Sequence, residues 1–187
     1  MIETLPVNKA TDLYPYCYSG RWSGCINILT PPELPATTLA EGCYTRMFDS
    51  CEYLQSAPEL PATTLATRCY HLMFSHCKSI KTPPELPATT LSDGCYLAMF
   101  RHCSFKTAPE LPATTVFAES YSYMFGNCGN LNYPPVINGT IFNRLACAGM
   151  FIDCTSLRRK ADITVTDAST DAFDYMYDGC TSLPPED

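Results

Sequence analysis

Apolar residues recur along this chain at a short spacing of four residues. In one representative segment, Cys69, Met73 and Cys77 are four residues apart, and Tyr70 and Phe74 follow the same step beside them. An apolar stripe with this spacing is typical of one face of a helix. The pattern therefore predicts a short helix of about three turns in this segment.

The same apolar groups also recur at a long and nearly constant interval. The Met-Phe pair begins at Met47, Met73, Met99, Met124 and Met150, and Met176-Tyr177 is a variant. A second phrase, Pro-Glu-Leu-Pro-Ala-Thr-Thr, begins at Pro32, Pro58, Pro84 and Pro109. A period of about 26 residues is typical of solenoids, in which each unit buries its apolar face only against its neighbours.

Each unit also contains an extended part. The prolines on both sides of Glu-Leu allow only a very short strand, because a proline lacks the N–H that a strand donates. We therefore expect an α/β solenoid that is right-handed, with short parallel strands on one side and short helices on the other. Helices pack about 8–10 Å apart and strands about 4.8 Å apart, so the helical side is expected to be convex.

The repeat organises almost the whole chain. We expect residues 1–187 to form a single solenoid domain of about seven units, with an atypical unit in 1–30, regular units in 31–137 and divergent units in 138–187. No polar capping unit follows at the C-terminus, where residues 180–187 resemble the start of another strand. Either a partner covers that end or the natural protein continues.

Composition narrows the classes of partner. The formal net charge is −7, from 19 acidic and 12 basic side chains, which argues against binding to nucleic acid. No apolar run reaches the roughly 18 residues that membrane insertion requires. Residues 1–13 lack the apolar core of a signal peptide. We expect a location on the cell surface, outside the cell or in a virion, and a cytoplasmic location stays open.

Twelve cysteines follow the repeat, and several pairs are eight residues apart. On a helix that spacing corresponds to about 12 Å, too far for a disulfide within one unit. We expect a column of small buried thiols. Bridges between neighbouring units and a zinc site built from His76-Cys77 and His102-Cys103 are the alternatives. Adjacent helical residues diverge, so we expect the cysteines to face inward and the histidines outward, with no metal and no cofactor.

Charged residues form two further columns. The first contains Glu33, Glu59, Glu85 and Glu110, and the second, four residues earlier in each unit, contains Gln55, Lys81, Lys106 and Arg158. These eight residues are the candidate binding residues. The alternative is a solvated face on which opposite charges compensate one another. We find no catalytic triad, phosphate loop or tuned pair of carboxylates, so we expect no enzyme activity.

The string Met-Phe-x-x-Cys-x-x-Leu/Ile, followed by Leu-Pro-x-x-x-Leu, resembles BspA-type leucine-rich repeats. Met73-Phe74, Cys77, Ile80, Leu86-Pro87 and Leu91 carry the resemblance, which covers roughly residues 16–185. The family usually has Ala-Phe where this chain has Met-Phe, and its unit is about three residues shorter. The Ala-Pro-Glu-Leu-Pro-Ala-Thr-Thr-Leu form resembles a subtype found in surface proteins of gut anaerobes and in their phages.

The resemblance implies a right-handed leucine-rich-repeat stack and a non-catalytic function. We expect a protein-recognition or adhesion module of a bacterial cell surface or phage virion, with a protein or a surface glycan as its partner. The alternative is an architectural spacer or decoration subunit that docks through its open C-terminal end.

Overall fold

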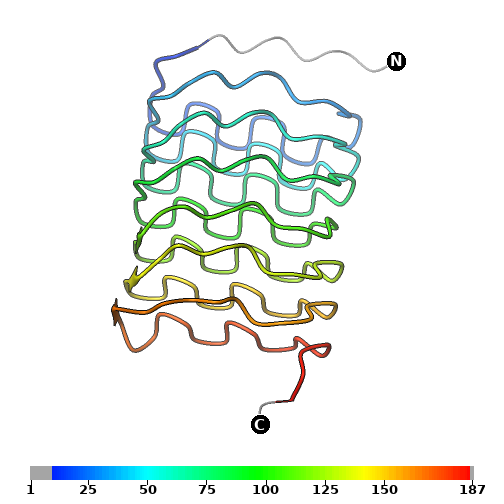
Figure 1. Cartoon of the computed structure of the whole chain (residues 1–187). Coiled ribbons are helices and arrows are strands. Elements are labelled where there is room, and N and C mark those ends of the chain that lie inside the picture. Colours follow the sequence, from blue (N-terminus) through cyan, green and yellow to red (C-terminus); the bar gives the residue numbers. More distant parts are fainter. Residues whose placement is uncertain (1–9, 186–187) are drawn as a thin grey trace.

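A computed structural model describes residues 10–185 as a stack of similar coils that runs from one end of the molecule to the other (Figure 1). Three two-residue strands, β1 (Thr115–Val116), β2 (Ile141–Phe142) and β3 (Asp167–Ala168), form one parallel sheet in the order β1-β2-β3. Each strand pairs with the segment 26 residues away, as in the partners Thr115 and Ile141. The predicted solenoid of repeating units of about 26 residues with short parallel strands is therefore confirmed.

Each coil has two unlike sides. One side is extended and nearly smooth, whereas the other follows a square-wave path (Figure 1). We call these the extended side and the turn side. The turn side holds the segment for which the sequence predicts a helix, and the extended side holds the Pro-Glu-Leu-Pro phrase.

The predicted helices are wrong: the part of the chain described here contains none. Alternate N–H groups on the turn side bond within the coil, as Met73 N–H does to the Tyr70 carbonyl at 3.1 Å. The N–H groups between them bond to the next coil, as Phe74 N–H does to the Met99 carbonyl at 3.0 Å. The segment is thus a run of tight turns stitched to its neighbour, and half of its hydrogen bonds join different coils.

The backbone dihedral angles explain this path. Every fourth residue of the turn side has a positive φ, including Arg68 at 52°, Leu72 at 55° and His76 at 61°. A left-handed residue at each fourth position reverses the chain and is incompatible with a continuous right-handed helix. Since the described residues contain no helix, a mismatch between helix spacing and strand spacing does not arise, and the reason for expecting a convex helical side does not apply.

The four-residue path places two side chains inward and the next two outward. Met47, Met73 and Met99 are completely buried, as the predicted interior row requires. The phenylalanines beside them stack face to face from coil to coil, with ring centroids 5.6 Å apart for Phe48 and Phe74. A parallel column of tyrosine rings stacks at about the same spacing. These continuous columns seal each coil onto the next.

The cysteines lie inside the same core. All twelve thiols are free, and nine of them are buried. Cys77 Sγ donates to the Phe48 carbonyl of the preceding coil at 3.1 Å, and Cys103 Sγ donates to the Phe74 carbonyl at 3.2 Å. The predicted column of buried thiols is confirmed. In six coils a thiol of the column that contains Cys77 also donates a hydrogen bond to a carbonyl of the preceding coil.

A single shortened unit is absorbed without a break in the columns. The step from Met99 to Met124 is 25 residues instead of 26. Phe105, which occupies the column of Ile80, is buried, and its ring meets Phe100 and Phe125 edge-on at 5.5 and 6.1 Å. Cys103 is only two residues before Phe105, whereas Cys77 is three before Ile80, so a larger side chain accompanies the shorter link.

Candidate binding face

The Pro-Glu-Leu-Pro phrase alternates between the core and the solvent. In one coil Leu60 and Ala62 are buried, while Glu59 and Pro61 are exposed. Residues of an extended chain point alternately to opposite faces, so each buried leucine turns the preceding glutamate outward. The packing of the core therefore fixes the orientation of the glutamates.

The backbone of this phrase is not paired between successive coils. Among the residues described, neither Glu59 nor Leu60 makes a backbone hydrogen bond, and the same holds at positions 33–34 and 85–86. One coil later the ladder begins, because Leu111 N–H donates to the Val136 carbonyl at 2.9 Å. The prolines thus prevent regular backbone pairing between three neighbouring extended segments. The backbone N–H and C=O groups of Glu-Leu in these segments remain available to a partner.

Open grooves lie between these segments. Three grooves with volumes of 460, 470 and 580 Å³ follow one another along the stack. Each groove contains two glutamates, from Glu33 and Glu59 in the first to Glu85 and Glu110 in the third, and each is otherwise lined largely by prolines. The repeat thus produces a row of equivalent recesses.

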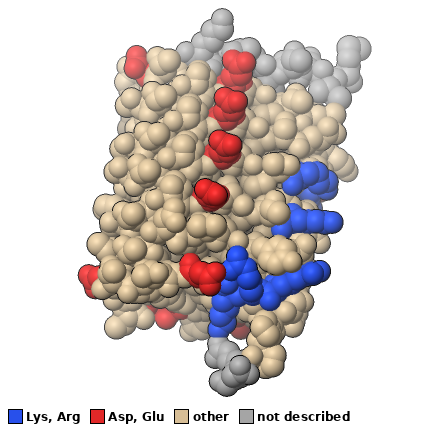
Figure 2. Space-filling view, in the orientation of Figure 1, with Lys and Arg blue, Asp and Glu red and all other residues tan. Residues whose placement is uncertain are grey.

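The acidic column is visible as a line of carboxylates across this face (Figure 2). All four predicted glutamates are exposed, and none of them forms an ion pair with a residue of the described chain. At a coil spacing of about 4.8 Å, two neighbouring carboxylates in water repel each other by under about 1 kcal/mol. An exposed column can tolerate that cost, and a cationic partner would remove it.

The basic column lies on the same face, beside the later part of the acidic column (Figure 2). Gln55, Lys81, Lys106 and Arg158 are exposed, as the sequence predicts for a binding face. Backbone hydrogen bonds continue this column, since Arg158 N–H donates to the Asn132 carbonyl at 3.0 Å and Asn132 N–H donates to that of Lys106 at 3.1 Å. The predicted compensation between the two columns does not take the form of ion pairs among these eight residues.

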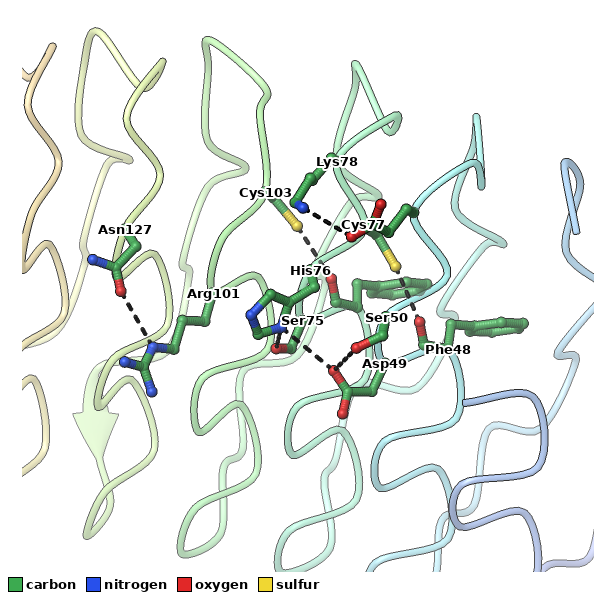
Figure 3. A network of polar contacts seen from close by, with 12 residues as sticks. Phe48, Asp49, Ser50, Ser75, His76, Cys77, Lys78, Arg101, Cys103 and Asn127 are labelled. Carbon is green, nitrogen blue, oxygen red and sulfur yellow. Dashed lines mark hydrogen bonds and ion pairs between the residues drawn. The ribbon is translucent and has the colours of Figure 1, made fainter. Parts of the chain in front are cut away.

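The turn side carries a separate polar network (Figure 3). Cys77 points into the core, while the partly exposed His76 ring lies 2.8 Å from Ser75 Oγ and 3.7 Å from Asp49. The rings of His76 and His102 stack at 4.3 Å, and burial lowers the pKa of His102. The cysteines and histidines thus point in different directions, as predicted. Within residues 10–185 no group of three or more histidines, cysteines or carboxylates could hold a metal ion.

Sequence reasoning missed the contribution of the prolines to this face. The grooves are lined by Pro58, Pro61, Pro84 and Pro87, whereas the sequence alone predicts for these prolines only that they shorten a strand. Their fixed place in each unit was the available signal. A proline that recurs in register with an exposed glutamate builds the wall of a groove as well as interrupting the ladder.

No protein-family model, no curated protein and no solved structure matches this chain. None of the described segments is a helix that could cross a lipid bilayer.

Proposed function

We propose that this protein is a non-catalytic recognition or adhesion module, which binds a protein or a surface glycan through its extended side. One observation carries the proposal: four exposed glutamates, which form no ion pair with another described residue, stand over three successive proline-lined grooves. We place such a module on a bacterial cell surface or in a phage virion, and a cytoplasmic location stays open.

The shape of the face favours an extended partner. Open grooves in a row suit a chain-like ligand that crosses several coils better than a small substrate, which is usually enclosed in a pocket. The free N–H and C=O groups at Glu59 and Leu60 could pair with a polypeptide backbone or with sugar hydroxyls. The neighbouring acidic and basic columns would select a partner with the opposite pattern of charge.

The same features argue against catalysis. General acid–base catalysis needs two groups whose environments differ. The glutamates of the column occupy equivalent positions and are all exposed, so no such difference is built in. Burial raises the pKa of the core thiols, to about 12 for Cys51 and for Cys128, which makes them poor nucleophiles at neutral pH.

We also propose that the chain is a divergent member of the BspA-type leucine-rich repeats, with a right-handed stack. In support, the Met, Phe and Cys positions of the motif and the Leu of Leu-Pro all lie in the core. A run of turns in place of the helices would then be the main departure of this member.

The proposal is tested by exchanging the acidic column. A displayed library of random peptides and a glycan array are screened with the wild-type chain, and the strongest binders are measured again with a Glu59→Gln/Glu85→Gln/Glu110→Gln variant. We expect at least a tenfold loss of affinity, since several charge contacts are removed together.

The matched control is Asp12→Asn/Asp93→Asn/Asp167→Asn, which removes three exposed carboxylates elsewhere. We expect this variant to bind like the wild type. Equal losses in both variants would reduce the effect to net charge, and no loss in the glutamate variant would rule out the extended side as the binding face.

The architectural alternative keeps one observation in its favour. The C-terminal end of the stack carries an open apolar hollow of 460 Å³, lined by Ile163, Val165, Phe173 and Met176 among others. A spacer subunit could dock there.

A further inference from the structure

The last coil ends the stack with a row of unused donors. On the turn side, alternate N–H groups of every earlier coil donate to the next coil, as Phe151 N–H does to the Met176 carbonyl at 2.9 Å. The corresponding N–H groups of the last coil make no hydrogen bond within the described chain. They belong to Phe173, Tyr175, Tyr177 and Gly179.

The first coil begins the stack with the complementary row of acceptors. Carbonyls at alternate positions of every later coil receive these bonds, as Met47 does from Trp22 N–H at 3.0 Å. The corresponding carbonyls of the first coil accept no hydrogen bond from a described residue. They belong to Cys17, Ser19, Arg21 and Ser23.

The aromatic columns reach both ends in the same register. Trp22 stacks on Phe48 at the N-terminal end with ring centroids 5.5 Å apart, and Tyr177 stacks on Phe151 at the C-terminal end at the same distance. Trp22 and Tyr177 are therefore the first and last members of a single column. Tyr177 also lines the hollow at the C-terminal end, where the Lys160 ammonium lies 5.6 Å from the centre of its ring.

The turn sides of the two end coils carry opposite charges. The turn side of the last coil carries Asp171, Asp174 and Asp178 and no basic residue. In the first coil, the turn side (14–25) carries Arg21 as its one charged residue, in the column that methionine occupies elsewhere. The Arg21 guanidinium lies 5.3 Å from the centre of the Trp22 ring.

We propose that the C-terminal coil of one copy docks on the N-terminal coil of a second copy, so that the solenoid continues from molecule to molecule. The N–H groups of Phe173, Tyr175, Tyr177 and Gly179 would then donate to the carbonyls of Cys17, Ser19, Arg21 and Ser23. The Arg21 guanidinium and the Lys160 ammonium, which lie over the two end rings, would move aside so that Tyr177 stacks on Trp22. Arg21 would then meet the aspartates. A head-to-tail contact of this kind does not close on itself, so it produces open linear chains.

The first test is the mass of the full-length protein as a function of concentration. In sedimentation velocity under reducing conditions, we expect the wild type to form a growing series of linear oligomers. Val165→Lys places a charge in the C-terminal hollow, where the valine is 48% exposed, and we expect at least a tenfold loss of association. Val136→Lys is the matched control, because this valine is 55% exposed on the flank of the stack, and it should assemble like the wild type.

A mixing experiment tests the polarity of the contact. A Val165→Lys copy keeps an intact N-terminal end, so adding it to the wild type should terminate growing chains and shorten them. Arg21→Glu should weaken association, and Arg21→Glu combined with Asp174→Arg and Asp178→Arg should restore it. Circular dichroism of each variant shows whether the coils remain folded.

Three outcomes would overturn the proposal. The wild type could stay monomeric at its highest soluble concentration, which would leave that end to another protein or to further coils of a longer chain. Val165→Lys and Val136→Lys could affect assembly equally, which would mean association through the flanks. Finally, the charge exchange could fail to restore assembly in variants that remain folded.

Discussion

The two sides of each coil solve the same stacking problem in different ways. The turn side uses alternate N–H groups of each coil to bond the next, and it places left-handed residues at every fourth position. The extended side of the first regular coils makes no such bonds at Glu-Leu, where the buried leucine and alanine supply the contact. The turn side is thus held together by hydrogen bonds between coils, stacked rings and buried thiols. The extended side is held together by the burial of apolar side chains, and its prolines interrupt backbone pairing.

This difference separates stability from recognition. The turn side contains the thiols, the methionines and the stacked aromatic rings, so a substitution there is expected to affect the whole stack. The extended side leaves its backbone and its carboxylates open to a partner. Four predictions test this division of roles.

The largest effect is expected from alkaline pH, which acts on the buried thiols of the turn side. Burial raises the pKa of the Cys51 thiol from its usual value of 9.0 to about 12. A raised thiol pKa means that its contribution to stability is intact below pH 9 and is lost as pH rises from 9 toward 12. Each such thiol removes about 1.4 kcal/mol per pH unit, and nine thiols are buried. We expect cooperative unfolding within about two pH units above 9, measured by circular dichroism.

Replacing Cys128 by alanine provides the control. This variant loses packing at neutral pH, but its free energy of unfolding should fall less steeply with rising pH than that of the wild type. A chain that stays folded at pH 12, with the same pH dependence in both forms, would contradict the role given to the buried thiols.

The next largest effect is expected from a stacked ring. Phe74 is completely buried between Phe48 and Phe100, so Phe74→Ala should lower the free energy of unfolding by about 3–5 kcal/mol in a denaturant titration. Leu60→Ala, the counterpart on the extended side, should lower the free energy of unfolding by an amount in the lower part of the range of about 2–5 kcal/mol. Tyr53→Ala, at a site 56% exposed, serves as the control and should change the free energy of unfolding by under about 0.5 kcal/mol. Similar small changes at all three positions would rule out the stacked core.

A smaller effect distinguishes a run of turns from a helix. Arg46 is exposed and has a φ of 53°, so Arg46→Gly should be more stable than Arg46→Ala by about 1 kcal/mol. In a helix the order would be reversed by a similar amount. The exposed Thr67, whose φ is not positive, is the control, since there alanine should be the more stable substitution. Thermal unfolding of the four variants gives the signs.

The smallest effect is expected from a proline of the binding face. Pro61 is exposed and its segment makes no ladder bonds, so Pro61→Ala should cost under about 1 kcal/mol, mainly through the unfolded chain. The reverse change on the turn side, Thr45→Pro, removes the bond from Thr45 N–H to the Gly42 carbonyl and should cost about 3 kcal/mol or more. Equal costs in denaturant titrations would remove the distinction between the two sides.

Much of this arrangement could be read from the sequence, because a fixed period places equivalent residues in columns. The rows of Met, Phe and Cys, the outward glutamates and the inward cysteines all followed from that reasoning. The helices did not, because a step of four residues fits both a helical stripe and a chain of turns. Gly20 and Gly24 are four apart, and Gly42 and Gly94 fall in the same phase of their units, which was the signal for left-handed positions. The grooves could not be predicted, since they depend on which backbone groups remain unpaired.

The near-identity of the proline-flanked segments has a consequence for inheritance. Residues 58–64 and 84–90 carry the same seven letters and occupy the same place in neighbouring coils. Unequal exchange between the corresponding stretches of the gene would remove or duplicate one whole coil. The buried side chains of the remaining coils would pack against the same residue types as before, and the number of grooves on the extended side would change by one. The length of the stack can therefore change by one coil at a time while the contacts between neighbouring coils stay the same.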